Sequence, residues 1–295
     1  MTGVLVIGRT GQVARALAEA GAGPCLGREA VDLERPETIA PAIRTHAPRL
    51  VINAAAYTAV DKAEEETGLA TLVNATAVGA LAEACAQAGA GLVHLSTDYV
   101  YPGTKTGPHT EDDPTDPVNA YGASKLAGER AALAANPRTA ILRTAWVYSP
   151  WGKNFVLTML RLADRDRLTV VADQHGQPTS ALDMARAIMA AAPRLLDAPP
   201  GDPVWGVHHL AGAGATTWAD FAEAVFDEAI ATGLIGRRPE VARITTAEYP
   251  TPARRPANST LDCSRFETAF GHPMRPWPDA LREVVARIAA DRAAA

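Results

Sequence analysis

Two side chains in the middle of the sequence carry its clearest chemistry. Tyr121 and Lys125 lie four residues apart, and a Ser96-Thr97-Asp98 segment precedes them. On a helix, four residues turn about 40° beyond one revolution, so the phenol and the ammonium would face one ligand. An ammonium in a water-poor cleft can lower the pKa of a tyrosine from ~10 toward ~7, and such a phenol can protonate a carbonyl oxygen as hydride arrives. The spacing predicts hydride transfer to a carbonyl; the alternative is two unrelated residues on a helix surface.

A glycine-rich turn near the amino end predicts the matching cofactor site. Gly8 and Gly11 follow the apolar stretch Val4–Ile7, Ala14 is the third small residue, and a helix is expected from Gln12. The glycines allow a tight turn, and the first amides of the helix can bind a pyrophosphate. The turn therefore predicts a dinucleotide site.

The choice of cofactor depends on the end of the second predicted strand, where NAD-selective sites place a carboxylate against the ribose 2′-hydroxyl. That region reads Gly27-Arg28. A guanidinium can pair bidentately with a 2′-phosphate, which favours NADPH. Glu29 and Asp32 leave NADH open, and Asp32 and Leu33 are alternatively placed beside the adenine.

Short apolar strands that alternate with helices predict the frame for these residues. The expected strands are Val4–Ile7, Pro24–Leu26, Leu50–Ile52, Gly91–Leu95 and Thr139–Leu142. This order predicts an α/β fold with a Rossmann-like, doubly wound parallel sheet. Such a sheet binds ligands beyond the carboxyl ends of its strands, where four loops are expected: Gly8–Gly11, Asn53–Ala56, Ser96–Asp98 and Thr144–Trp146.

The alternation loosens after about residue 150, where aromatic and proline-rich loops appear. We therefore expect an NADP-binding domain over residues 1–150 and a smaller, loop-rich α/β domain, mainly for substrate, over residues 151–295. A helix over Met184–Ala192 and a strand over Val204–Leu210 are expected to return to the main sheet, near residues 184–211. A last helix is expected over Asp279–Ala290.

The composition is that of an ordinary folded protein of 295 residues. A formal net charge of -5 offers no positive field for nucleic acid or a membrane surface. No stretch is expected to approach the ~20 apolar residues of a membrane span, and no leader pattern opens the sequence. Three cysteines without metal-like spacing predict reduced thiols, so a cytoplasmic location is expected.

The remaining polar clusters are interpreted as mainly structural. His208 and His209 lie in an apolar strand without ligand spacing, so no metal is predicted there. Asp61–Glu66 predicts a helix start with a solvated acidic face. Arg254 and Arg255 are placed either at a substrate diphosphate or in a salt-bridged linker.

These segments resemble the extended short-chain dehydrogenases and, among them, the dTDP-4-dehydrorhamnose reductase family. The resemblance covers nearly the whole chain, and its motifs are Gly8–Val13, Asn53–Glu64, Ser96–Gly103, Tyr121–Glu129, Arg143–Tyr148 and Tyr249–Pro256. Some bacterial members form a magnesium-linked dimer through acidic residues. Here Arg15 and the Ala181–Met184 stretch offer few acids, so no metal and a monomer or weak homodimer are expected.

The resemblance implies roles for three groups of residues. Thr97 would bond the 4-keto oxygen, Tyr121 would donate the proton and Lys125 would hold the nicotinamide ribose. Together with the turn, the expected cofactor contacts are Gly8, Thr10, Gly11, Gln12, Val13, Arg28, Asp32, Leu33, Ala54, Ala55, Ala56, Thr58, Tyr121 and Lys125. The expected substrate contacts are Val60, Ser96, Thr97, Asp98, Tyr99, Tyr121, Trp146, Asn154 and Arg254. For Asp98, a turn-forming carboxylate is the alternative.

The resemblance implies NADPH-dependent reduction of dTDP-4-dehydro-L-rhamnose, a dTDP-4-keto-6-deoxysugar. Dehydratases of this fold carry a glutamate base where this chain has Tyr99, so reduction is favoured over dehydration, while epimerases are harder to separate. Reduction of another dTDP-4-keto-deoxysugar stays open. So does a non-catalytic role, because a regulatory subunit of methionine adenosyltransferase also resembles this family.

Overall fold

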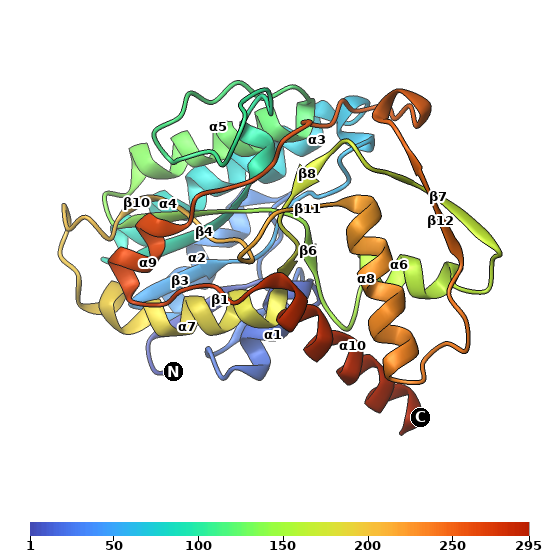
Figure 1. Ribbon diagram of the computed structural model, residues 1–295. Helices are drawn as coiled ribbons and strands as arrows, with labels where there is room; N and C mark the ends of the chain where they lie inside the picture. The colour runs from blue at the N-terminus through green and yellow to red at the C-terminus, as the bar shows by residue number, and fades with distance from the viewer. Residues whose placement is uncertain (295) are drawn as a thin grey trace.

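The computed structural model describes residues 1–294, and its centre is a six-stranded parallel sheet (Figure 1). The strands are β1 (Val4–Ile7), β2 (Cys25–Leu26), β3 (Leu50–Asn53), β4 (Gly91–Thr97), β5 (Thr139–Thr144) and β10 (Gly206–His209). Their order in the sheet is β10-β5-β4-β3-β1-β2. From β1 the chain builds β2 on one side and β3 on the other, which is the switch of a doubly wound fold. The predicted fold class is confirmed.

The strands are apolar on both faces because helices cover both faces. In β1, Val4 and Val6 join one buried cluster, whereas Leu5 and Ile7 join the other, since successive side chains of a strand point to opposite faces. The covering helices are α1 (Gln12–Glu19) and α7 (Ala181–Asp197) on the first face, and α2 (Ile39–His46), α4 (Ala77–Gln87) and α5 (Ala120–Ala135) on the second.

One helical run, Thr67–Gln87, has the length and composition of a membrane span, with a mean hydropathy of 1.5. The expectation that no stretch approaches one is therefore wrong. The run consists of α3 (Thr67–Thr71), a π-helical turn at Leu72–Thr76 and α4. Its most apolar window is 56% buried, because α4 packs against α2, α5 and β4. Its hydropathy is that of a core helix in this fold.

The smaller elements lie mainly beyond residue 146. They are β6 (Val147–Tyr148), α6 (Phe155–Leu162), β7 (Arg167–Val171), β8 (His175–Gly176), β9 (Thr179–Ser180), β11 (Thr216–Thr217), α8 (Trp218–Ala231), β12 (Glu240–Ile244), α9 (Ser264–Phe270) and α10 (Trp277–Ala293). Short 3₁₀ turns cover Pro36–Thr38, Lys62–Glu64, Asp98–Val100 and Thr246–Glu248. β6 pairs with β9 and β7 with β12, both parallel, and β8 pairs antiparallel with β11. The predicted return to the main sheet is confirmed, because β10 pairs with β5.

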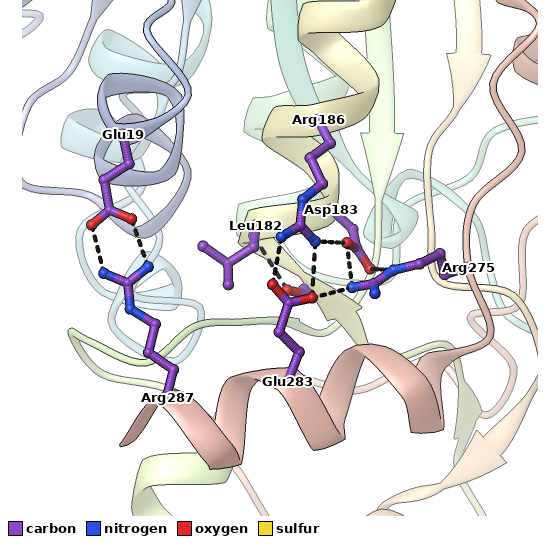
Figure 2. A network of polar contacts seen from close by, with 8 residues as sticks. Glu19, Leu182, Asp183, Arg186, Arg275, Glu283 and Arg287 are labelled. Atoms are coloured by element: carbon purple, nitrogen blue, oxygen red, sulfur yellow. Dashed lines mark hydrogen bonds and ion pairs between the residues drawn. The ribbon is translucent and has the colours of Figure 1, made fainter. Parts of the chain in front are cut away.

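A charge network fastens α10 to α7 (Figure 2). Asp183 on α7 accepts hydrogen bonds from Arg186 and Arg275, each at 2.7 Å. Glu283 on α10 accepts from the same two guanidinium groups. Beside it, Arg287 donates to Glu19 of α1 at 2.7 and 3.0 Å. The hydrogen bond from Arg186 is the largest cause that lowers the pKa of Glu283, which falls to about 2.

The variant Glu283→Gln is expected to destabilise the fold by about 1 kcal/mol at neutral pH, because an amide cannot neutralise two guanidinium groups. The pKa of Glu283 is about 2 in the folded protein and about 4.3 in the unfolded chain. The stabilisation that its carboxylate provides is therefore complete above pH ~4.3 and is lost as the pH falls toward 2. Urea unfolding of both proteins at neutral and at acidic pH measures the difference. The exposed Asp166→Asn variant is the control. An equal difference at both pH values would contradict the prediction.

Candidate active site

A cavity of about 870 Å³ lies at the carboxyl ends of the sheet strands, where a doubly wound fold binds its ligand. All the predicted cofactor residues except Asp32 line it: Gly8, Thr10, Gly11, Gln12, Val13, Arg28, Leu33, Ala54, Ala55, Ala56, Thr58, Tyr121 and Lys125. Ser96, a predicted substrate residue, lines it too. Arg9, Glu29 and Thr144, from segments expected at the ligand edge, also line it, whereas sequence reasoning misses Val73, Lys153 and Met184.

The glycine turn has the geometry that a pyrophosphate needs. Gly8 has a φ of +115°, a region that favours glycine. A Cβ there would lie 3.3 Å from the carbonyl carbon of Ala54, so a side chain would crowd the neighbouring loop. Gly11 precedes α1 and offers no side chain to its first amides, which can therefore bind phosphate oxygens. The turn fits a dinucleotide.

Charged side chains of both signs gather where the ribose 2′ position is predicted. Arg28 pairs with Glu34 and Asp32, and Arg9 pairs with Glu29 at 2.6 Å. The Asp32 carboxylate also accepts a hydrogen bond from the backbone amide of Glu34, and Asp32 does not line the cavity. This geometry does not support its predicted contact with the cofactor. A 2′-phosphate would have to exchange with carboxylates that already bond the guanidinium groups.

Tyr121 and Lys125 both lie on α5 and both line the cavity, as their spacing predicts. Asn119 caps the helix, since its Oδ1 accepts from the Gly122 amide at 2.8 Å. A Cβ at Gly122 would lie 2.2 Å from the carbonyl oxygen of Tyr99. Glycine therefore lets α5 approach the chain after β4, and the rings of Tyr99 and Tyr121 meet edge to face at 5.8 Å.

A buried hydroxyl and carboxyl lie beside Tyr121. Thr97 donates from Oγ1 to Asp98 Oδ1 at 2.8 Å and accepts from the Tyr99 amide at 3.2 Å. Burial raises the pKa of Asp98 to about 6, although hydrogen bonds from Ser259 and Thr97 act in the opposite direction. The carboxyl stands at the start of a 3₁₀ turn, as the turn interpretation requires, and it is buried next to the phenol, as the site interpretation requires.

Lys125 is bonded to the floor of the site. Its Nζ donates to the carbonyl oxygen of Leu95 at 2.7 Å and lies 3.1 Å from Nε2 of His94. The sequence predicts that this ammonium lowers the pKa of Tyr121, but the pKa is raised, first by burial and then by Asp98. The prediction is wrong for this arrangement because the phenol is desolvated while the lysine is committed to His94 and Leu95.

Three of the predicted substrate residues, Trp146, Asn154 and Arg254, lie among the smaller elements or in the loop before them. The Trp146 ring stacks on Trp218 with centroids 3.5 Å apart, and its backbone has a φ of +47°. This strained position is typical of functional sites. Val60 is half-buried in the segment after β3.

Asn154 is poorly placed for the substrate contact that the sequence predicts. Its Nδ2 donates to Gln12 Oε1 and to the Ser149 carbonyl oxygen, both at 2.9 Å. Its Oδ1 accepts from the Leu157 amide and thereby caps α6. Because both ends of the amide are bonded within the fold, Asn154 positions the loop before α6 against Gln12, a cavity residue.

The predicted acidic segment contacts Arg255 through Asp61. Asp61 accepts from Arg255 at 2.8 and 2.9 Å through its two oxygens, and Glu64 accepts from the Ala120 amide at 2.8 Å. Both side chains are at least partly exposed, as expected of a solvated face, and both also form hydrogen bonds within the fold. Arg254 is exposed, and its carbonyl oxygen accepts from Asn119. Arg255 follows the linker alternative.

Asn74 is a positioning residue that sequence reasoning misses. Its Nδ2 donates to the Tyr57 carbonyl oxygen and to Ser124 Oγ, both at 3.0 Å, and its Oδ1 accepts from the Tyr57 amide at 2.9 Å. The π-helical turn that contains Asn74 is a device common at functional sites. The amide ties the loop after β3 to α5. An asparagine inside an apolar helical run is the signal that the sequence offers.

The parallel sheet, the glycine turn and the Tyr121–Lys125 pair on one cavity define a dehydrogenase or reductase of the short-chain class. The family model described as the RmlD substrate binding domain matches residues 1–290, and the chain belongs to this family. The resemblance recognised from the sequence is confirmed.

Named relatives agree with this assignment. The chain is 49% identical over 286 residues to a dTDP-4-dehydrorhamnose reductase of Sinorhizobium fredii, with 95% of each chain covered. It is 44% identical over 283 residues to that of Salmonella typhimurium, covering 93% of this chain and 94% of the relative.

Solved structures of similar proteins have the same fold. A dTDP-4-dehydrorhamnose reductase from Clostridium acetobutylicum has a TM-score of 0.88 at 35% identity and covers 97% of this chain and 99% of its own. The enzyme of that name from Bacillus anthracis, in complex with NADP, has a TM-score of 0.86 at 30% identity, with 96% and 98% covered.

Proposed function

We propose that this protein reduces the 4-keto group of dTDP-4-dehydro-L-rhamnose and so forms dTDP-L-rhamnose, with NADPH supplying the hydride. The observation that carries the proposal is the position of Tyr121 and Lys125 on one helix, in the wall of the cavity that begins at the Gly8–Gly11 turn. The glycine turn, the first amides of α1, and Arg9 and Arg28 near the predicted ribose position fit the dinucleotide. The similar reductases named above support the substrate class.

The proposed chemistry divides among three side chains. C4 gains the hydride, O4 gains the phenol proton of Tyr121, and Thr97 bonds the same oxygen once its hydroxyl hydrogen turns away from Asp98. The phenolate left on Tyr121 needs a nearby cation, because burial and Asp98 raise the pKa of the phenol. Lys125 supplies that cation and holds the nicotinamide ribose, so the reaction requires a charged Lys125.

We extend the proposal to the organisation of the chain. Residues 1–150, with the return near 184–211, bind the cofactor, and residues 151–295 mainly bind the substrate. Asp98, Tyr99, Trp146, Val60 and Arg254 border the sugar or its diphosphate. The enzyme acts in the cytoplasm as a monomer or weak homodimer.

A steady-state assay tests the function. Purified protein should oxidise NADPH with dTDP-4-dehydro-L-rhamnose, and NMR of the product should show dTDP-L-rhamnose. A panel of other dTDP-4-keto-6-deoxysugars decides which sugar is preferred. Binding of NADPH without turnover of any nucleotide sugar would overturn the proposal and favour a non-catalytic, regulatory role.

The variant Arg28→Ala is expected to raise the KM for NADPH about tenfold, or ~1.4 kcal/mol, and to leave the KM for NADH nearly unchanged. Only the 2′-phosphate needs the guanidinium group, and part of its binding energy is offset by the loss of Glu34 and Asp32 as partners. Steady-state kinetics with both cofactors measures the change, with the exposed Arg44→Ala variant as control. Equal changes for both cofactors would contradict a 2′-phosphate role.

A further inference from the structure

His94 is buried beside the proposed catalytic lysine, and its neighbours determine its tautomer. It lies on β4 directly opposite Asn53 of β3, and both side chains are fully buried. Asn53 Oδ1 accepts from the Ala55 amide at 3.2 Å, which leaves Nδ2 to donate to Nδ1 of His94 at 3.0 Å. A ring nitrogen that accepts carries no proton, so the single proton of the neutral ring is on Nε2.

The Nε2–H of His94 faces the lysine. Nζ of Lys125 lies 3.1 Å from Nε2 and donates to the Leu95 carbonyl oxygen at 2.7 Å. An ammonium has only donors, so a charged Lys125 would place two donors against each other. A neutral amine has a lone pair that accepts from Nε2–H, and one of its N–H groups donates to Leu95. The hydrogen-bond geometry therefore fits the amine.

Burial acts in the same direction. Lys125 is 1% exposed, and burial lowers its pKa to about 8 while Glu129 favours the ammonium. Burial is the largest cause that lowers the pKa of His94, and a charged Lys125 would lower that pKa further, so the ring is neutral whether or not Lys125 carries a proton.

The other titratable groups near His94 and Lys125 are Glu129, Tyr121 and Asp98. Glu129 is itself paired with Arg143 of β5 at 2.6 Å. Tyr121 on α5 and Asp98 after β4 have pKa values that burial raises. Lys125 is therefore the group of the pair whose charge changes slightly above neutral pH.

We propose that His94 is a positioning residue that holds Lys125 as a neutral amine, and that the enzyme takes up a proton at Lys125 when it binds the anionic cofactor. The inference rests on the proposed function, because it takes the lysine to face the nicotinamide ribose. The proton comes from solvent and converts the amine of Lys125 to the ammonium. The ammonium then donates hydrogen bonds to ribose oxygens and no longer accepts one from Nε2–H of His94. Lys125 thus becomes positively charged only when the cofactor is bound, and this is the charge that the phenolate of Tyr121 requires.

Calorimetric titration of the full-length protein with NADPH, in buffers of different ionisation enthalpy, measures the proton uptake. At about pH 8.5 the 2′-phosphate, with a pKa of ~6, is fully ionised, so the uptake reports on the protein. The wild type is expected to take up a large fraction of one proton. His94→Gln is expected to take up almost none, because its amide oxygen can accept from the ammonium and keep Lys125 charged beforehand. His208→Gln is the matched control, since His208 is also a buried ring in the sheet but bonds Val204.

Absence of uptake in the wild type, or equal uptake in His94→Gln, would overturn the inference. If His94→Gln does not fold, NMR of wild-type protein with ¹⁵N-labelled histidine decides, since the two ring tautomers have different nitrogen shifts. An Nε2–H tautomer for His94 supports the inference, and an Nδ1–H tautomer overturns it. The tautomer is measured without cofactor or sugar, so a protein that fails to turn over the sugar would count against the proposed function alone.

Discussion

Replacing Tyr121 by Phe is expected to lower kcat for ketone reduction by about 100- to 10,000-fold, the usual contribution of a general acid. The phenol is the proposed donor to the 4-keto oxygen, and without it the developing alkoxide has only Thr97 as a partner. The ring itself packs edge to face on Tyr99, and Phe preserves that contact. The affinity for NADPH is therefore expected to change little, as fluorescence titration would show.

Tyr249→Phe is a suitable control for this substitution, since Tyr249 is 56% exposed on a different segment. Its kcat should match that of the wild type. A Tyr121→Phe enzyme that retains the wild-type kcat would remove the phenol from the mechanism. A loss of NADPH affinity equal to the loss of rate would instead assign Tyr121 to cofactor binding.

Glu129→Gln is expected to destabilise the protein by about 3–5 kcal/mol, because it leaves a buried guanidinium without its counter-charge. Glu129 and Arg143 are 1% and 4% exposed. Arg143 donates to Glu129 from Nη2 at 2.6 Å and from Nε at 3.0 Å, and Ser96 donates to the same carboxylate. Nη1 of Arg143 donates to Tyr101 at 2.6 Å. The pair joins α5 to β5 directly beneath the site.

Chemical denaturation measures the free energy of unfolding of Glu129→Gln and of Asp227→Asn. The comparison shows how much of the cost comes from the burial of the ion pair rather than from the loss of any ion pair. Asp227 pairs with Arg238 at 2.6 Å, but both side chains are more than half exposed, at 63% and 52%. The control is therefore expected to cost less than about 1 kcal/mol. Similar costs for the two variants would show that the Glu129–Arg143 pair contributes no more than a surface pair does.

Much of the fold and part of the site could be predicted because they depend on local patterns. The period of the apolar residues identifies the strands, and the spacing of Tyr121 and Lys125 places them on one helix face whatever the surroundings. The Asp61–Arg255 pair could not be found in this way, because the two residues are 194 positions apart. Their contact depends on how the loops fold back over the sheet.

The direction of the pKa shift of Tyr121 could not be predicted from the sequence either. It depends on which partner a side chain meets, and Lys125 meets His94 and Leu95. Asn154 shows the same limit, since the family resemblance places it at the substrate while its hydrogen bonds show a capping role. Residue type and spacing predict which groups can do chemistry, whereas direction and partner come from tertiary packing.

The position of β10 at the edge of the sheet has a consequence for biosynthesis. β5 receives its outer neighbour only from Gly206–His209, and the first face of the sheet is covered by α7, another late segment. A nascent chain that has released only residues 1–150 would leave the part of this apolar face beneath α7 uncovered and a strand edge open to pairing with other molecules. We therefore expect residues 1–150 to complete their fold only after most of the polypeptide has left the ribosome, and to aggregate if expressed as a separate fragment.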